Sequence, residues 1–239
     1  MTSSDGPAGT TTRRQRRNGA QETASEGAAH EQLGTRLREA RVAANLGVRE
    51  LARQLDLSAS LISQIELGRV VPSVSTLYAL TNTLGVSMDS LFAGGDLAPP
   101  SETSRPIGGL RPPAVPEREP SPGESAYIQR ATQRRAIELE QGVRWELLTP
   151  SPEPGAEFLE VTYPVGGSSS PNDHAIRHSG RDYCLILQGE LSVQIGFEEH
   201  LVGPGDSLAF DGTIPHRFWN VGSVPVHAVW FVLDRSATR

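Results

Sequence analysis

The feature that most constrains how this chain folds is a proline-rich stretch over residues 93–124. It holds eight of the eighteen prolines in the 239-residue chain, with Gly, Ser and Glu between them. Such a composition cannot build a hydrophobic core and tends to stay extended, so we interpret it as a linker. The flanking regions then fold as separate domains, which the length of the chain also favours.

Residues 31–92 have the apolar spacing of helices. In the first helix, one face carries residues at i, i+4, i+7 and i+11: Leu33, Leu37, Ala40 and Ala44. Further helices are expected over about 48–55, 59–67, 73–84 and 87–92, because capping residues and glycines mark their ends. We therefore predict a compact domain of five helices.

The second and third of these helices have the pattern of a helix-turn-helix. Asp56 lies in the turn between them, where a left-handed backbone is needed and Asp is tolerated better than most residues. The apolar residues of the third helix face the core and leave one edge polar, which is the kind of surface that a DNA major groove accepts. That edge consists of Ser58, Ala59, Ser60, Ser63 and Gln64.

Residues 31–92 resemble the Xre-type helix-turn-helix family. The resemblance rests on Glu50-Leu51-Ala52, on the segment 58–68, on Pro72-Ser73 and on Leu84-Gly85-Val86-Ser87. It implies a regulator that binds a double-stranded DNA operator, with Ala59, Ser60 and Gln64 facing bases and Ser63 and Arg69 near phosphate. It also implies an internal pair between Arg41 and Glu66.

The chain departs from this family at the start of the second helix. A phosphate-binding Gln is common there, whereas this sequence has Val48. Arg49 or Arg53 is expected to take over that contact. The alternative is a helical domain that has lost DNA binding and only packs against its neighbour.

The net charge of −6 does not by itself favour a nucleic-acid partner. By segment the charge is +1 for residues 1–30, 0 for 31–92, −2 for 93–124 and −5 for 125–239. The acidity therefore belongs to the linker and the C-terminal half. Because residues 31–92 have no basic excess, the prediction of DNA binding depends on the motif.

Residues 1–30 are rich in Ser, Thr, Gly and Ala and have no apolar periodicity, which predicts a disordered tail. The tail contains the basic run Arg13-Arg14-Gln15-Arg16-Arg17. This run is either a solvated patch or an arm that reaches a DNA groove or backbone.

Residues 125–239 contain short apolar runs separated by turn signals such as Gln188-Gly189, Pro204-Gly205-Asp206 and Asp211-Gly212. This pattern is typical of a small antiparallel barrel or sandwich. Cys184, the single cysteine, lies in one of the apolar runs, so we expect a buried thiol and no internal disulfide.

Two stretches of this half resemble the paired motifs of the cupin superfamily. The first is His178-Ser179-Gly180-Arg181-Asp182 followed by Gly189, and the second contains Gly205, His216 and Asn220. The resemblance implies an antiparallel cupin β-barrel and therefore an α+β multidomain protein. Alternation agrees, because one strand face would carry Ile176, His178, Asp182, Cys184 and Ile186.

The cupin resemblance also implies a binding site inside the barrel. We expect it to bind an effector through His178, Asp182, His216 and Phe218. Ile176 replaces the first histidine of the metal-binding pattern, leaving His178, Asp182 and His216 as candidate ligands for iron or zinc. Two histidines and one carboxylate also bind iron in non-haem oxygenases. Without a metal, these residues would hydrogen-bond an organic effector or each other.

These features favour a transcriptional regulator that senses a small molecule and is not an enzyme. We expect a homodimer, because one helix-turn-helix contacts only half of a two-fold operator. No apolar run could span a membrane and the first thirty residues lack a signal peptide, so a cytoplasmic location is expected.

Two alternatives remain open at this stage. The first is a non-haem iron-dependent oxygenase or epoxidase, similar to hydroxypropylphosphonate epoxidase, in which a helical domain precedes an iron-binding cupin. In the second, the cupin domain serves only for dimerisation.

Overall fold

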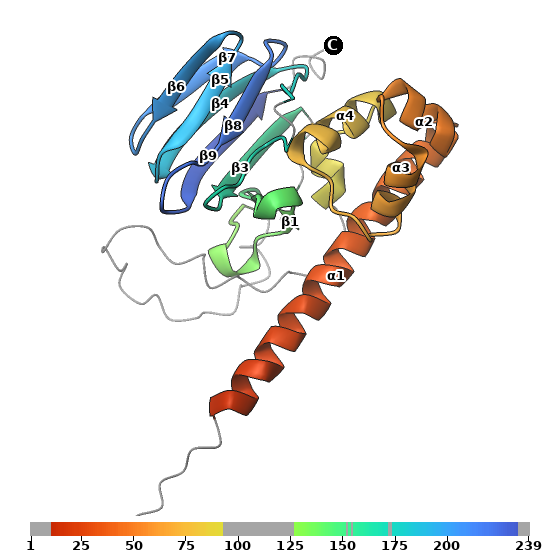
Figure 1. The fold of residues 1–239 in the computed structure, drawn as a ribbon, viewed down its shortest axis with the longest axis horizontal. Helices are drawn as coiled ribbons and strands as arrows, with labels where there is room; N and C mark the ends of the chain where they lie inside the picture. Colours follow the sequence, from red (N-terminus) through yellow and green to blue (C-terminus); the bar gives the residue numbers. More distant parts are fainter. Residues whose placement is uncertain (1–10, 93–126, 152, 154, 172–173, 234–239) are drawn as a thin grey trace, which may run out of the picture.

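The computed structural model describes residues 11–92, 127–151, 153, 155–171 and 174–233, so the predicted linker lies outside the described residues. The helical half packs beside a β-sheet half, and the long helix α1 extends away from both (Figure 1). The helices are α1 (Thr11–Ala43), α2 (Val48–Gln54), α3 (Ala59–Glu66), α4 (Val74–Leu84) and the 3-10 turn η1 (Met88–Phe92).

The first helix is longer than the sequence predicted. We expected a disordered tail over residues 1–30, but α1 begins at Thr11, so the prediction was wrong for residues 11–30. The missing apolar periodicity was a poor guide there. Arg, Gln, Glu and Ala favour a helix by intrinsic propensity, and extending an existing helix costs less than starting one. Residues 1–10 lie outside the described residues.

Up to residue 92, the described part of the chain has four α-helices where the sequence predicted five. The expected fifth helix is the 3-10 turn η1, which is too short to form a regular α-helix. The other ends agree closely with the sequence pattern. Ser58 and Ser73 cap α3 and α4 by accepting hydrogen bonds from Leu61 N and Thr76 N, and Gly85 ends α4 in a left-handed conformation.

The C-terminal half consists of two antiparallel sheets. The larger has the strand order β1-β2-β3-β9-β4-β7 and the smaller β6-β5-β8. The strands are β1 (Ala136–Glu138), β2 (Arg144–Leu147), β3 (Ala156–Tyr163), β4 (Arg181–Gln188), β5 (Leu191–Ile195), β6 (Glu198–Val202), β7 (Ser207–Asp211), β8 (His216–Trp219) and β9 (Val226–Leu233). Two 3-10 turns, η3 (Ala131–Gln133) and η4 (Glu140–Gly142), lie among them. Closure of these sheets into a barrel stays a prediction.

Side-chain alternation separates the two faces of the larger sheet. Buried and exposed residues alternate along β4, and the predicted inward face is confirmed. All five of its members are buried: Ile176, His178, Asp182, Cys184 and Ile186. The sheets pack together through aromatic contacts such as Phe218 of β8 on Trp230 of β9, whose ring centroids lie 4.7 Å apart.

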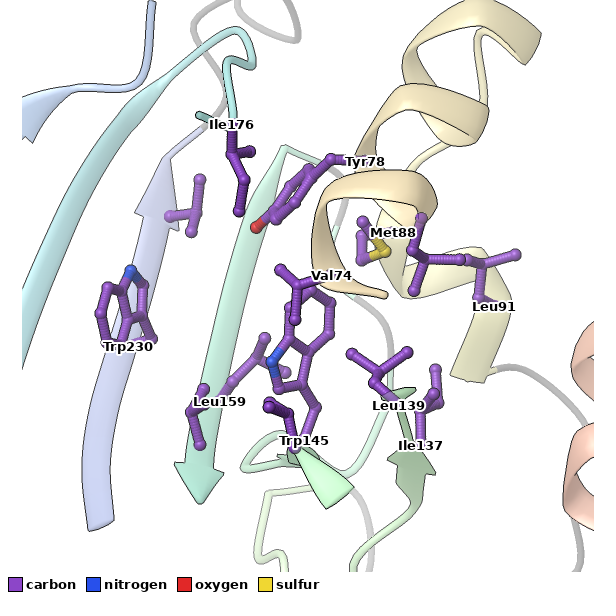
Figure 2. Packing of buried hydrophobic residues seen from close by; sticks show 14 of the residues in the cluster. Val74, Tyr78, Met88, Leu91, Ile137, Leu139, Trp145, Leu159, Ile176 and Trp230 are labelled. Atoms are coloured by element: carbon purple, nitrogen blue, oxygen red, sulfur yellow. The ribbon is translucent and has the colours of Figure 1, made fainter. Parts of the chain in front are cut away.

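One hydrophobic core joins the two halves of the molecule. Figure 2 shows Val74 and Tyr78 of α4 beside Trp145 of β2 and Ile176, with Met88 of η1 close by. Backbone hydrogen bonds reinforce this packing: Ser75 N donates to Ser169 O at 3.0 Å, and Glu140 N donates to Pro72 O at 3.0 Å. The helical half is therefore docked directly on the sheet half.

Among the described residues, the search for a helix both long enough and apolar enough to cross a bilayer found none.

Candidate functional site

The first candidate site is the polar edge of α3. Ser58 and Ser60 are exposed, while Ala59, Ser63 and Gln64 are half-buried. Ile62 and Ile65 on the opposite side of α3 are almost fully buried, which fixes the direction in which the polar edge points. The structure thus presents the predicted residues along one edge, and their contact with DNA stays a prediction.

The turn before α3 adopts the conformation that the sequence indicated. Asp56 has a φ of 54°, in the left-handed region. Leu51 and Ala52 of α2 are buried against the core, so the small side chain of Ala52 lies where the helices pack together. This geometry holds α2 and α3 as a helix-turn-helix pair.

A buried ion pair fixes α3 against α1. Arg41 Nε lies 2.5 Å from Glu66 Oε1 and Arg41 Nη2 lies 2.9 Å from Glu66 Oε2, which is a bidentate arrangement. Arg41 also donates to the carbonyl oxygen of Leu46 at 2.8 Å. The pairing of Arg41 with Glu66 implied by the family resemblance is confirmed.

The arginines considered for phosphate contacts differ in their surroundings. Arg53 is exposed but forms an ion pair with Glu50 at 2.6 Å. Arg49 and Arg69 are exposed, and neither has an ion pair within the described part of the chain. Of the two candidates in α2, Arg49 is therefore the side chain better placed for a phosphate.

The second candidate site is a buried cluster of His178, Asp182 and His216. One potential ligand atom from each residue lies within 4.8 Å of the others. His178 Nε2 and Asp182 Oδ2 are 3.3 Å apart. Both atoms are buried and lack a well-aligned hydrogen-bond partner among the described residues. Unsatisfied polar atoms are costly in a protein interior, so they point to a ligand between them.

Neighbouring groups orient each member of the cluster. His178 Nδ1 lies 3.1 Å from the carbonyl oxygen of Ser179, and His216 Nδ1 lies 2.8 Å from that of Ile214. A carbonyl oxygen only accepts, so each Nδ1 carries a proton. Nε2 of His216 keeps a lone pair in the neutral ring, whereas Nε2 of His178 faces the Asp182 carboxylate and carries the second proton when that ring is charged. Trp230 Nε1 donates to Asp182 Oδ1 at 3.1 Å, while Asp182 Oδ2 faces His178 Nε2. Metal-binding residues are typically oriented in this way.

The two histidines have different electrostatic surroundings. Burial opposes protonation of His178, but the adjacent Asp182 carboxylate outweighs burial and raises the pKa of His178. Burial lowers the pKa of His216 and so favours its neutral form. A neutral imidazole is the form that binds a metal or accepts a hydrogen bond.

The cluster opens into a small, mostly apolar cavity. Its walls include Ile176 and Phe218 from the sheet half and Val74 and Tyr78 from α4. Phe218 was predicted to contact an effector, and it lies in this wall with its ring centroid 5.5 Å from that of His216. Ile176 lines the cavity where the metal-binding cupin pattern has a histidine, so three candidate ligands remain.

The role of Tyr78 was not predicted from the sequence. Its ring stacks on His178, with centroids 4.5 Å apart and planes inclined by 13°. The signal available in the sequence was an aromatic residue next to Leu77 on a helix whose other buried residues, apart from Thr81, are aliphatic. That signal does not reveal which partner the ring meets.

Comparison with known proteins identifies both halves. A helix-turn-helix domain model matches residues 32–92, and a cupin domain model matches residues 159–232. The chain is 28% identical over 192 residues to the HTH-type transcriptional regulator PuuR of Escherichia coli, an alignment that covers 80% of this chain and 88% of that protein.

Among solved structures, the chain is similar to an HTH_3 family transcriptional regulator from Vibrio cholerae. The TM-score is 0.57 at 17% identity, covering 87% of this chain and 98% of that one, so the two share a fold. Hydroxypropylphosphonic acid epoxidase from S. wedmorenis covers 85% of this chain and 98% of its own, with 18% identity and a TM-score of 0.40. That score is too low to carry an argument.

Proposed function

We propose that the cupin domain of this Xre-type helix-turn-helix transcriptional regulator binds a small-molecule effector around His178, Asp182 and His216. The observation that carries the proposal is the buried cluster itself, in which His178 Nε2 and Asp182 Oδ2 form no well-aligned hydrogen bond among the described residues and lie beside an apolar cavity. A few convergent polar groups in an apolar pocket are typical of small-molecule sites.

In this proposal the polar edge of α3 reads a double-stranded DNA operator. Bases are contacted by Ala59, Ser60 and Gln64, while phosphates are contacted by other members of the DNA-binding set: Ser58, Ser63, Arg49 and Arg69. Support comes from the partial exposure of that edge and from the match of residues 32–92 to the helix-turn-helix model. We place this activity in the cytoplasm, together with the DNA.

A divalent metal ion, iron or zinc, fits the His178–Asp182–His216 cluster. The three groups supply two imidazole nitrogens and one carboxylate oxygen, and all three are held by neighbouring groups. A bound ion would supply a positive centre for an acceptor atom of the effector. The chain's own residues then position the effector, with Phe218 covering its apolar part.

We also propose that the regulator acts as a homodimer joined through the outward face of the larger sheet. That face exposes a cluster of apolar side chains: Phe158, Tyr183, Leu185, Leu187, Phe231 and Leu233. Contiguous apolar patches of this kind mark interaction surfaces. A second copy is the partner that a two-fold operator requires.

The experiment uses an operator selected from genomic DNA by the purified protein. His216→Ala should bind this operator as tightly as the wild type but should lose zinc binding in isothermal titration and any effect of zinc on operator affinity. His200→Ala is the matched control, because His200 is exposed on β6. Zinc binding by His216→Ala with wild-type affinity would remove the cluster from the proposal.

The same ligand set is compatible with an iron-dependent oxygenase, which is the second candidate. With Ile176 in place of a fourth ligand, a bound ion would keep coordination positions open for water, oxygen or substrate. We expect no sustained oxygen consumption when protein loaded with ferrous iron meets oxygen and a panel of hydroxy acids. Substrate-dependent oxygen uptake that is lost in both His178→Ala and Asp182→Ala would make the enzyme the better conclusion.

A further inference from the structure

Tyr78 connects the DNA-binding half to the cluster in the sheet half. Its ring stacks on His178 at 4.5 Å and meets Trp145 edge-on at 5.7 Å. Its hydroxyl donates to Glu157 Oε2 of β3 at 3.3 Å. Figure 2 shows the ring reaching from α4 toward Ile176. A single side chain of α4 therefore contacts three elements of the cupin domain.

The stacked pair separates two spaces. On one side is the cavity with the cluster, and on the other is a more polar cleft between the domains that includes Asn82 of α4 and Glu157 of β3. Only Tyr78 and His178 line both spaces within the described residues. The ring pair is thus the partition between the interdomain cleft and the cavity.

The cavity beside the cluster is too small to hold an organic molecule while Tyr78 stays in place. Its volume is about 20 Å³, which suffices for an ion or a water molecule. Trp145, which lines the cavity, also has a buried indole N–H with no partner among the described residues. A ligand that satisfies this group needs a hydrogen-bond acceptor, and the apolar walls favour an aliphatic or aromatic body.

We propose that the effector site is shared by both domains, with Tyr78 as a wall that an organic effector must displace from His178. The effector class is a small molecule with an apolar body and a hydrogen-bond acceptor, entering from the interdomain cleft. This inference rests on the proposed effector function of the cavity. It adds a route by which effector binding can reach the DNA-binding half, since displacing Tyr78 changes the contacts between α4 and the sheet.

The packing of α4 explains why that displacement would reach the DNA-binding half. Leu77 and Leu80 of α4 are almost fully buried in the core, with relative exposures of 0% and 2%. Because its side chains are tightly packed there, we expect a displacement of α4 to carry the other helices of the DNA-binding half with it. An effector that binds the opened arrangement more tightly shifts the population toward altered domain docking.

The test uses Cys184 of the full-length protein as a reporter of access to the cavity. Cys184 is the single cysteine and is buried on the inward face of β4, two residues after Asp182. Cys184 is paired in register with Trp230 of β9, which lines the cavity. We would measure its modification by methyl methanethiosulfonate in wild type, Tyr78→Ala and Tyr78→Leu.

Removal of the stacked ring should increase the labelling rate about tenfold or more in both variants, since local opening controls access to buried groups. Tyr78→Phe keeps the ring, and Asn82→Ala alters only the cleft side, so both should stay within about threefold of wild type. Leu191→Ala truncates a buried side chain in the smaller sheet and controls for a general loss of stability. Wild-type rates in both Tyr78→Ala and Tyr78→Leu would overturn the inference.

Zinc titration of the same proteins separates this inference from the proposed function. If Cys184 labelling accelerates in Tyr78→Ala and Tyr78→Leu but the cluster binds no zinc, the role of Tyr78 as a shared wall is supported and the proposed metal site is wrong. If zinc binds normally but labelling does not respond to loss of the ring, the metal site stands and the shared wall is wrong.

Discussion

The geometry of the cluster depends on the absence of a side chain at Gly212. A Cβ atom there would lie 2.6 Å from His178 Cε1, 2.7 Å from His178 Nδ1 and 3.0 Å from Asp182 Oδ2. Gly212→Ala should therefore turn the imidazole and lower zinc affinity by about tenfold or more, as loss of groups that orient metal ligands does. Gly203→Ala has open space around it and should bind zinc like wild type in the same titration. Equal zinc affinity in both variants would mean that the cluster tolerates the added methyl group.

A second prediction for single residues concerns pH. A hydrogen bond with His227 lowers the pKa of Glu160, burial opposes this, and Arg134 lowers the pKa further. A lowered folded-state pKa stabilises the fold above the unfolded pKa of about 4.3, and this contribution disappears as pH falls through the folded-state pKa. The stability difference between wild type and Glu160→Gln should therefore shrink from about pH 6 toward about pH 3 in urea unfolding. Glu199→Gln, at an exposed position on β6, should show no such change. Because Glu146 and His227 also lie in this network, His227→Gln should be measured alongside.

At the scale of elements, we expect different residues in and just after α3 to contact DNA bases and DNA phosphates. Gln64 is half-buried on the polar edge and Arg69 is exposed just beyond the helix. Gln64→Ala should cost about 1–3 kcal/mol on the selected operator and little on random DNA, since an amide can pair bidentately with adenine. Arg69→Ala should weaken both similarly and reduce the salt dependence by about one unit of slope. Fluorescence anisotropy with both DNAs over a range of salt concentrations measures these effects. Equal losses on both DNAs for Gln64→Ala would exclude it from base reading.

The elements that the sequence predicted best are those specified by local signals. Ser58, Asp56 and Gly85 mark ends and turns through their own backbone preferences, so the limits of α2, α3 and α4 agreed with the pattern to within a residue or two. Alternation along β4 likewise placed His178 and Asp182 on one face. The placement of β9 between β3 and β4 was not predictable in this way, because it depends on contacts between distant strands. The stacking of Tyr78 on His178 escaped prediction for the same reason.

At the scale of the whole molecule, the predicted linker suggested two loosely tethered domains. The described residues instead show a shared core and direct hydrogen bonds, including the contact of Asn82 Nδ2 with Arg177 O at 3.4 Å. Composition predicts that the linker has no core, but it cannot reveal whether the domains that it joins have complementary faces. A signal between them can therefore pass through α4 without passing through residues 93–124.

Assembly is the last prediction at this scale. On the outward face of the larger sheet, Phe231 is paired in register with both Phe158 and Tyr183, which aligns three exposed aromatic rings across β3, β9 and β4. Double substitution of Tyr183→Glu and Phe231→Glu places carboxylates in this row and should convert the proposed dimer to a monomer at micromolar concentration, because burying unpaired charge is costly. The operator affinity should fall by about tenfold or more as the two recognition helices lose their linkage. Phe197→Glu is the matched control, since Phe197 is fully exposed on the hairpin between β5 and β6. Sedimentation velocity distinguishes the states, and a double variant that stays dimeric would place the interface on another surface.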